Sequence, residues 1–128
     1  MEEPKKQEKR RFVRVEITVP VKYRSYRNDS IFRANFNVGR SRDLSVGGLR
    51  VSVSKHNPVD SKLDMEIELP DSMPAYVIGK VVGGEDVVID GIVHHYDRIS
   101  FVDMDKEIQD VIMKQVFENL RKKGTKGR

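Results

Sequence analysis

The chain has 128 residues, of which 38% are hydrophobic and 34% are charged, and its formal net charge is +4. This size and composition indicate one folded domain and exclude wholesale disorder or a fibrous repeat. The absence of cysteine excludes a disulfide framework, a thiolate zinc site and a cysteine nucleophile, and it favours a cytoplasmic location. Because the longest stretch without a charged residue spans residues 72–79, the sequence predicts no membrane-spanning segment.

Charge is distributed unevenly along the chain. Residues 1–50 carry 13 basic and 6 acidic side chains, residues 51–120 carry 6 and 14, and residues 121–128 carry 5 and none. A positive first half beside a negative second half favours an anionic partner of limited size near the N-terminal segments. The basic tail suits the C-terminal end of a helix, and contact with a membrane or a nucleic acid is the alternative.

Alternating apolar and polar side chains predict a series of short strands. The pattern first runs from residue 13 to residue 23, where Pro20 lacks a backbone donor and is expected at an edge or a bulge. Further strands are predicted over residues 32–38, 49–53, 63–69, 75–82, 87–96 and 98–102. Turn residues separate them at 27–30, at Gly47-Gly48, at 83–86 and at Asp97.

The apolar spacing changes to a helical period after Asp103 or Asp105, either of which suits a helix N-cap. Basic residues 121–123, followed by Gly124, are typical of the C-terminal end of such a helix. Strands this closely spaced leave no room for crossover helices, and closing the sheet would remove its edges. The sequence therefore predicts a mainly β fold: a small antiparallel six- or seven-stranded β-barrel with one C-terminal α-helix.

Catalysis and metal binding have little support in the sequence. The three histidines, His56, His94 and His95, occur without a nucleophile motif or a pair of catalytic carboxylates. His94 and His95 are neighbours on a predicted strand and point to opposite faces, so they cannot readily chelate one ion together. We therefore expect no catalytic residue, no metal ligand and no cofactor, and we predict a structural role for the histidines.

Two arginines at the start of the first strand form a candidate anion site. Arg10 and Arg14 are four residues apart, and an extended chain places both side chains on the same side. An arginine can bind phosphate with both arms of its fork, bond the O6/N7 edge of guanine and stack on a base. The pair is a weak signal alone, because a charged leader is usually solvated.

A second candidate site is Asp43-x-Ser45-x-x-Gly48. The carboxylate can accept from guanine N–H groups, the hydroxyl can donate or accept, and glycine lets the backbone approach a ligand closely. The same residue types also favour an ordinary β-turn. The two motifs in this order carry more weight together than either does alone.

Arg10-x-x-x-Arg14 followed by Asp43-x-Ser45-x-x-Gly48 resembles the hallmark of the PilZ domain family, which is RxxxR at the start of a β-barrel and then [D/N]xSxxG. The resemblance covers roughly residues 9–120, through the late strand at 98–103 and the closing helix. It implies a non-catalytic receptor for the bacterial second messenger cyclic di-GMP, a ring of two guanosine units joined by two phosphodiesters.

The resemblance also implies which residues bind this ligand. The arginine pair would contact phosphate and guanine, the Asp and Ser side chains would bond the guanine edge, and glycine would permit close approach. The implied ligand-binding residues are Arg10, Arg11, Arg14, Asp43, Ser45, Gly47 and Gly48, with Ser41 and Arg42 as further neighbours. Alanine at Arg14 or Asp43 is then expected to weaken binding with little change in the melting temperature.

The expected organisation is a flexible basic leader over residues 1–11, a PilZ-like barrel with its closing helix over 12–120, and a basic tail over 121–128. The leader would close over the ligand and relay the signal to a protein effector, for which the family suggests the flagellar motor or another regulated machine. Its sequence is similar to the C-terminal module of flagellar-brake-type PilZ proteins, so the chain could be an excised domain.

Two other functions stay open from the residues alone. One is a small β-barrel that binds single-stranded nucleic acid through its arginine-rich strands. The other is a PilZ-like barrel that interacts with proteins and binds no ligand, although the complete five-residue signature argues against it. The resemblance is compatible with one cyclic di-GMP molecule or with a stacked pair.

Overall fold

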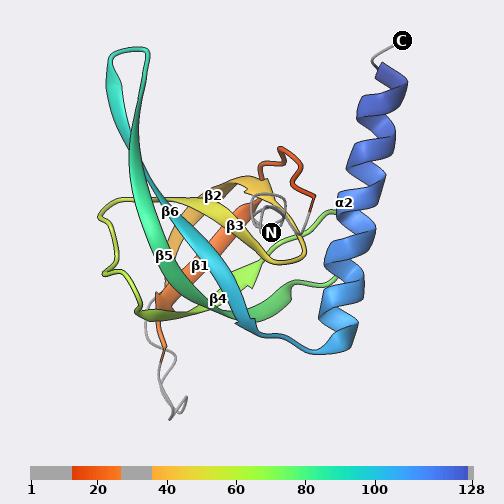
Figure 1. Cartoon of the computed structure of the whole chain (residues 1–128), viewed down its shortest axis with the longest axis horizontal. Coiled ribbons are helices and arrows are strands. Elements are labelled where there is room, and N and C mark those ends of the chain that lie inside the picture. Colours follow the sequence, from red (N-terminus) through yellow and green to blue (C-terminus); the bar gives the residue numbers. More distant parts are fainter. Residues whose placement is uncertain (1–12, 27–35, 127–128) are drawn as a thin grey trace, which may run out of the picture.

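The computed structural model describes residues 13–26 and 36–126, and six strands within them close into a barrel (Figure 1). The strands are β1 (Pro20–Ser25), β2 (Asn37–Leu44), β3 (Gly48–Val53), β4 (Lys62–Ile67), β5 (Ala75–Ile89) and β6 (Ile92–Asp103). Around the barrel they follow the order β1-β2-β3-β6-β5-β4, and adjacent strands are antiparallel. The mainly β fold and the antiparallel barrel are confirmed, and the described strands number six.

Alternate side chains of these strands point inward and form the core. Every second residue of β3 and β4 is buried, which is the period-two pattern of a strand with one dry face. Leu44, Val51, Ile67 and Val81 are completely buried. Burial of each side chain of this kind contributes about 1.5–3 kcal/mol, so the interior fixes the backbone from which the outer side chains project.

The first strand is shorter than its sequence pattern. The ladder begins at Pro20, because a residue without a backbone donor is tolerated as the first residue of a strand. The edge or bulge expected for Pro20 is wrong, because a closed barrel has no edge and β1 pairs with β2 from Pro20 onward without a register shift. Val15 forms an isolated bridge with Leu44, and both Val15 and Val19 are buried. The alternation before Pro20 therefore reflects packing against the barrel rather than membership of the sheet.

The second strand, predicted over residues 32–38, is observed as β2 from Asn37, and residues 32–35 lie outside the described ranges. Strand β2 continues to Leu44, so residues 41–44, which the sequence analysis placed after the strand, belong to the ladder. Part of the second predicted motif therefore lies on a strand of the barrel.

The hairpin of β5 and β6 is longer than the sequence predicted. The chain turns at Asp90-Gly91, whose φ angles of 52° and 79° suit a two-residue type I′ turn. The turn expected at residues 83–86 and the break expected at Asp97 are wrong, because these residues pair within the ladder. A register shift between Val81 and Gly83 accommodates the glycines. Figure 1 shows the hairpin extending beyond the rest of the barrel.

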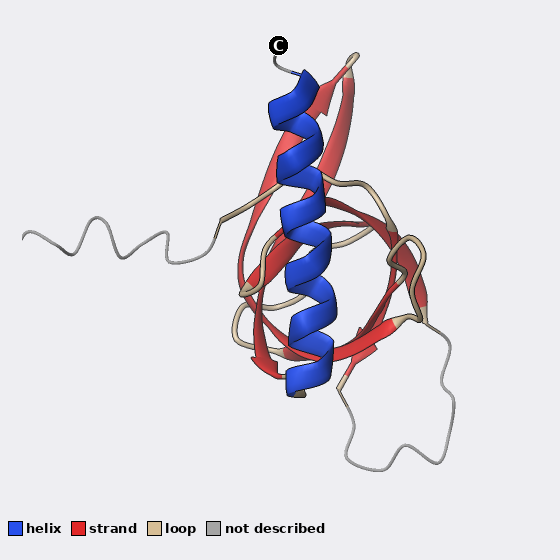
Figure 2. Cartoon of the chain, turned by 90° about the vertical axis from the view of Figure 1, so that its right-hand side faces the viewer, coloured by secondary structure: helices blue, strands red, loops and turns tan. Residues whose placement is uncertain are grey.

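Helix α2 (Lys106–Lys126) packs against the barrel, and in Figure 2 it crosses in front of the ring of strands. Its contact face buries Ile112 and Val116, and Gln115 donates from Nε2 to the carbonyl oxygen of Pro70 at 3.1 Å. The predicted C-terminal helix is confirmed, although its backbone continues past Gly124. Among the described residues, no helix combines the length and apolar character needed to cross a membrane.

Candidate functional site

A β-bulge in β2 turns Asp43 to the outside of the barrel. Ser41 pairs with Val51, whereas Asp43 pairs with Arg50, so residues 41–43 of β2 oppose only two residues of β3. A shift of one residue moves a side chain to the other face of a sheet. Ser41 therefore shares the inner face with Val51, and Asp43 shares the outer face with Arg50.

Arg50 holds the carboxylate of Asp43 with two hydrogen bonds and a further ion-pair contact. Arg50 donates from Nε to Asp43 Oδ2 at 2.8 Å and from its backbone nitrogen to Oδ1 at 3.2 Å, and its Nη2 lies 2.7 Å from Oδ2. Its Nη1 donates to Glu85 Oε2 on β5 at 2.7 Å. Burial alone would lower the pKa of Arg50, but the hydrogen bond and charge of Asp43, with Glu85, raise it. Asp43 is 4% exposed, so a buried carboxylate lies at the centre of this cluster.

Arg14 joins the same cluster from the segment before β1. Its Nη1 lies 3.7 Å from Asp43 Oδ2, while about half of the Arg14 side chain stays exposed. The structure therefore brings together one residue from each of the two motifs. Arg10 and Arg11 lie outside the described residues. We use the name Asp43 cluster for Arg14, Asp43, Arg50 and Glu85.

The burial of Asp43 bears on the effect expected for its replacement. The sequence predicts that replacement of Asp43 by alanine weakens ligand binding with little change in the melting temperature. An Asp43→Ala variant removes the acceptor of two Arg50 hydrogen bonds and the partner of its ion pair, so we expect it to destabilise the barrel as well. Arg14 is the cleaner position for testing binding because of its exposure.

Ser45, Gly47 and Gly48 form the tight turn between β2 and β3. Ser45 Oγ accepts from the backbone nitrogens of Gly47 and Gly48 at 3.1 and 3.2 Å, and the Ser45 backbone nitrogen donates to the Gly48 carbonyl oxygen at 2.8 Å. A Cβ on Gly48 would collide with the carbonyl oxygen of Ile99 on β6. The structural role of this turn is therefore visible, and contact of these residues with a ligand stays a prediction.

Ser41 and Arg42, the further expected neighbours, have different environments. Ser41 is buried, donates from Oγ to the carbonyl oxygen of Ile17 at 2.5 Å and accepts from the Val19 nitrogen at 3.0 Å. The Arg42 guanidinium lies 5.2 Å from the centre of the Tyr96 ring. Within the described ranges, Arg42 Nη1 is the buried side-chain nitrogen that lacks a hydrogen-bond partner. Arg42 therefore has a donor available beside Asp43, while Ser41 serves the fold.

Sequence reasoning missed Arg50, Glu85 and Arg98. Arg98 pairs with Arg50 across β3 and β6, and its guanidinium lies over Gly83, where a Cβ would collide with it. The alternation of side chains in β3 places Arg50 outside the barrel. This alternation was the one feature of the sequence that could have pointed to Arg50 as a site residue. The contacts of Arg50 with Asp43 and Glu85 depend on the bulge in β2 and on the continuous β5–β6 hairpin, and the sequence predicted a turn within that hairpin.

Two of the three histidines lie in a side-chain cluster that the sequence did not predict. His56 and His95 converge on Asp86, although they come from different parts of the chain. His94, the neighbour of His95 in the sequence, is not part of this group. This cluster is the one among the described residues with the side chains and spacing to hold a metal ion.

The closed barrel, its helix and the outer cluster of arginines and acids define a small β-barrel domain. The family model for the PilZ domain matches residues 8–118, and the chain belongs to the PilZ domain family. PilZ domains are binding modules rather than enzymes, and the chain belongs with them. A comparison with curated proteins gives no match.

Several solved structures share this fold. The inhibitor of motility MotI/DgrA of Bacillus subtilis is 14% identical with a TM-score of 0.72, over 93% of this chain and 53% of that one. The PilZ domain of Escherichia coli YcgR, determined with c-di-GMP, is 16% identical with a TM-score of 0.70, over 92% and 96%. The MrkH complex with c-di-GMP from K. pneumonia is 15% identical with a TM-score of 0.72, over 93% and 55%. The chain thus spans about half the length of MotI/DgrA and MrkH.

Proposed function

We propose that the chain is a non-catalytic receptor for cyclic di-GMP. The observation that carries this proposal is the meeting of Arg14 and Asp43 on the outer face of a PilZ barrel, because each residue comes from a different half of the motif. The YcgR PilZ domain and MrkH, which share the fold, have structures with c-di-GMP. These two findings support the same ligand for this chain.

The chemistry of the Asp43 cluster suits a guanine nucleotide with two phosphates. Arg14 has a half-exposed guanidinium that can bind phosphate or the O6/N7 edge of guanine. Asp43 can accept from guanine N–H groups while Arg50 holds its carboxylate in place. Arg42 and Arg98 add positive charge nearby, which favours a dianion.

The finer mechanism belongs to this proposal too. The arginine pair Arg10 and Arg14, of which Arg10 lies outside the described residues, closes over the ligand that Asp43 and the Ser45–Gly48 turn hold, with Arg11 as a neighbour. Ordering of this leader then presents a new surface to a protein effector in the cytoplasm. The name of MotI/DgrA, an inhibitor of motility, supports a motility machine as the class of effector.

Titration calorimetry with cyclic di-GMP tests the proposal on the full chain. We expect saturable binding, and we expect Arg14→Ala to weaken it about tenfold or more, because a good bidentate contact to guanine is worth up to about 3 kcal/mol and about 1.4 kcal/mol is already tenfold. The melting temperature of this variant should stay close to that of the wild type. Lys114→Ala, an exposed cation on α2, is the charge-matched control and should bind normally.

The same titration separates the alternatives. A single-stranded oligonucleotide that displaces cyclic di-GMP at equal charge would favour the nucleic-acid barrel, and absence of any binding would favour a pure protein-interaction domain. Normal affinity in Arg14→Ala would contradict the assignment of the site. The fitted stoichiometry also distinguishes one bound messenger from a stacked pair.

A further inference from the structure

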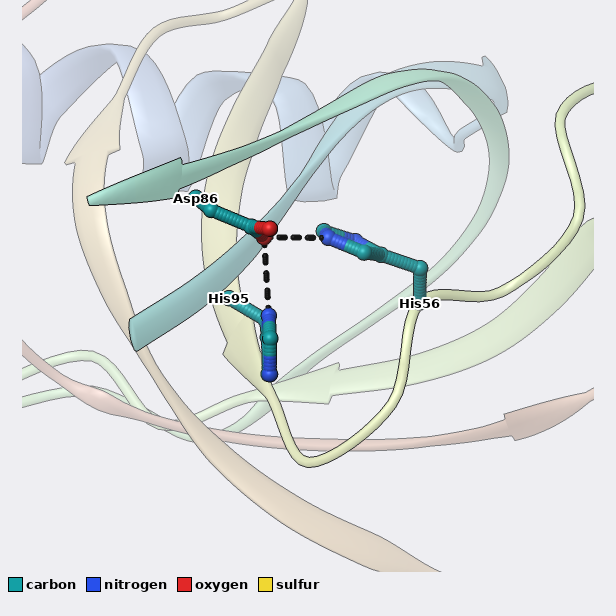
Figure 3. A group of neighbouring side chains, drawn as sticks. All are labelled: His56, Asp86 and His95. Carbon is teal, nitrogen blue, oxygen red and sulfur yellow. Dashed lines mark hydrogen bonds and ion pairs between the residues drawn. The ribbon is translucent and has the colours of Figure 1, made fainter. Parts of the chain in front are cut away.

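Three side chains from separate segments converge on the β5–β6 hairpin (Figure 3). His56 belongs to the loop between β3 and β4, Asp86 to β5 and His95 to β6, where it pairs directly with Asp86. His56 Nε2 lies 2.7 Å and His95 Nδ1 2.8 Å from the same oxygen, Asp86 Oδ1. One nitrogen from each of two imidazoles thus points at one carboxylate.

The orientation of His56 is fixed from its other side. His56 Nδ1 lies 2.7 Å from Oδ1 of Asp97, a completely buried carboxylate on β6. Asn57 donates to Asp97 Oδ2 from its backbone nitrogen at 3.0 Å and from its amide at 2.9 Å. A Cβ on Gly84 would lie 2.8 Å from His56 Nδ1, so glycine at this position leaves the space that the ring occupies. The ring is therefore held with Nε2 directed at Asp86.

This arrangement has the features of a metal site in which a further residue orients one of the ligands by a hydrogen bond. Histidine ligands in proteins typically donate their second ring N–H to a carboxylate, which fixes the tautomer and leaves the other nitrogen for the metal. The contact between His56 Nδ1 and Asp97 supplies that support. The ligand set of two imidazoles and one carboxylate occurs in zinc proteins, in which water completes a tetrahedral site.

We propose that His56, Asp86 and His95 bind one divalent transition metal ion, for which zinc is the best-suited metal. The three ligand atoms lie within 4.8 Å of one another. In a tetrahedral zinc site with bonds of about 2.0–2.1 Å, ligand atoms are separated by about 3.3 Å. Asp86 must therefore move about half an ångström away from each imidazole nitrogen, which its 53% exposed side chain allows. The two imidazole nitrogens must also come to about 3.3 Å from each other. Water reaches the fourth position because His56 and His95 are also over a third exposed.

The ion would join the loop after β3 to both strands of the hairpin. The proposal does not depend on cyclic di-GMP, because none of the three ligands belongs to the Asp43 cluster. It also explains why a buried carboxylate lies in the middle of β6, where the sequence predicted a break between strands.

Calorimetric titration of the full chain with zinc chloride tests the site. We expect one zinc ion per chain, with affinity reduced at least tenfold in His95→Gln and in Asp86→Asn. His94→Gln is the matched control, since this neighbouring histidine is outside the cluster and its variant should bind normally. Asp97→Asn should lower the affinity about 10–100-fold, as loss of an outer-sphere partner does. Absence of saturable binding, or equal affinities of His94→Gln and His95→Gln, would overturn the proposal.

A measurement on the wild-type chain covers the case in which a variant fails to fold. The chain has three histidines, so their ring signals can be assigned by NMR. Zinc should shift the signals of His56 and His95 and leave that of His94 in place. A shift confined to His94, or uniform shifts of all three rings, would contradict the assignment. Visible absorption of added Co²⁺, with bands of tetrahedral intensity, should appear in the wild type and be lost in Asp86→Asn.

Discussion

Arg50 connects three strands through its side chain, because it lies on β3 and binds Asp43 on β2 and Glu85 on β5. Its Nε and Nη2 both engage one carboxylate oxygen, so the planar guanidinium fixes the direction in which Asp43 points. A residue outside the recognised motif thereby determines the geometry of a residue inside it.

We predict that Arg50→Ala lowers the free energy of unfolding by about 1–3 kcal/mol, because buried Asp43 would lose its closest charged partner and keep only the longer contact with Arg14. Arg50→Lys should recover part of this loss, since an ammonium group is a point charge without the fork of arginine. Urea unfolding measures both changes. Arg98, which pairs with Arg50 from β6, is exposed and provides the control. Arg98→Ala should change the free energy of unfolding by less than about 0.5 kcal/mol. An equal loss in both alanine variants would contradict this role of Arg50.

Gly48 belongs to the motif, and its close packing against β6 gives it a structural role. Gly48→Ala should destabilise the barrel by about 1–3 kcal/mol, because its Cβ would collide with the backbone of Ile99 on β6. Gly83→Ala is the control, since its Cβ would meet the mobile end of the Arg98 side chain, which can swing away. Thermal unfolding of both variants checks the prediction, and a control loss as large as that of Gly48→Ala would refute it.

At the residue scale, the sequence predicts site residues that belong to one short motif. It does not predict clusters whose residues come from distant segments of the chain. The motif places Asp43, Ser45 and Gly48 correctly at the junction of two strands, because their spacing is local. His56 and His95 meet only because β3 pairs with β6 and the hairpin continues past Gly84. No local spacing carries that information.

At the scale of elements, the alternation of side chains predicted most strands. The β5–β6 hairpin contains two segments with residues typical of turns. Gly83-Gly84 was interpreted as a turn, whereas the chain turns at Asp90-Gly91. Gly83 makes room for Arg98 and Gly84 for His56, so both glycines serve side chains packed on a continuous strand. A glycine inside a strand marks close approach as readily as it marks a turn.

The segment before β1 supplies the element-scale test of ligand closure. If Arg10 and Arg14 bind cyclic di-GMP together, amide exchange at residues 9–14 should slow when the ligand is added, because two bidentate contacts can offset the entropy lost on ordering. The measurement is hydrogen exchange followed by mass spectrometry, with α2 as the internal reference. Equal exchange of residues 9–14 with and without ligand would mean that this segment does not act as the switch.

At the scale of the whole molecule, the two oppositely charged halves of the sequence meet across the barrel. Arg50 from the basic half binds Glu85 from the acidic half, and His56 lies between Asp86 and Asp97 of the acidic hairpin. The acidic segment therefore partly neutralises the outer face on which Arg14 and Arg98 project. Net charge along a sequence predicts the sign of a partner, but the pairing of strands decides which charges stay available.

The histidine network gives the molecule a defined dependence of stability on pH in the absence of metal. The pKa of His56 is raised, first by its hydrogen bond to Asp97 and then by that to Asp86. The pKa of Asp86 is lowered, first by its hydrogen bond to His95 and then by that to His56. A histidine whose pKa is raised in the folded chain stabilises the fold at a pH below its pKa in the unfolded chain, which is about 6.5. An aspartate whose pKa is lowered in the folded chain stabilises the fold at a pH above its pKa in the unfolded chain, which is about 3.9.

We therefore predict that, with a chelator present, the contribution of this network to stability is greatest between about pH 4 and pH 6.5. It should decline above that range, as the pH rises through the raised pKa of His56, because the folded chain then loses a proton that the unfolded chain has already released. It should decline in acid as Asp86 is protonated. Urea unfolding across this range checks the profile. His56→Asn should remove the alkaline decline, His94→Gln should retain it, and an unchanged profile in His56→Asn would show that the decline arises elsewhere.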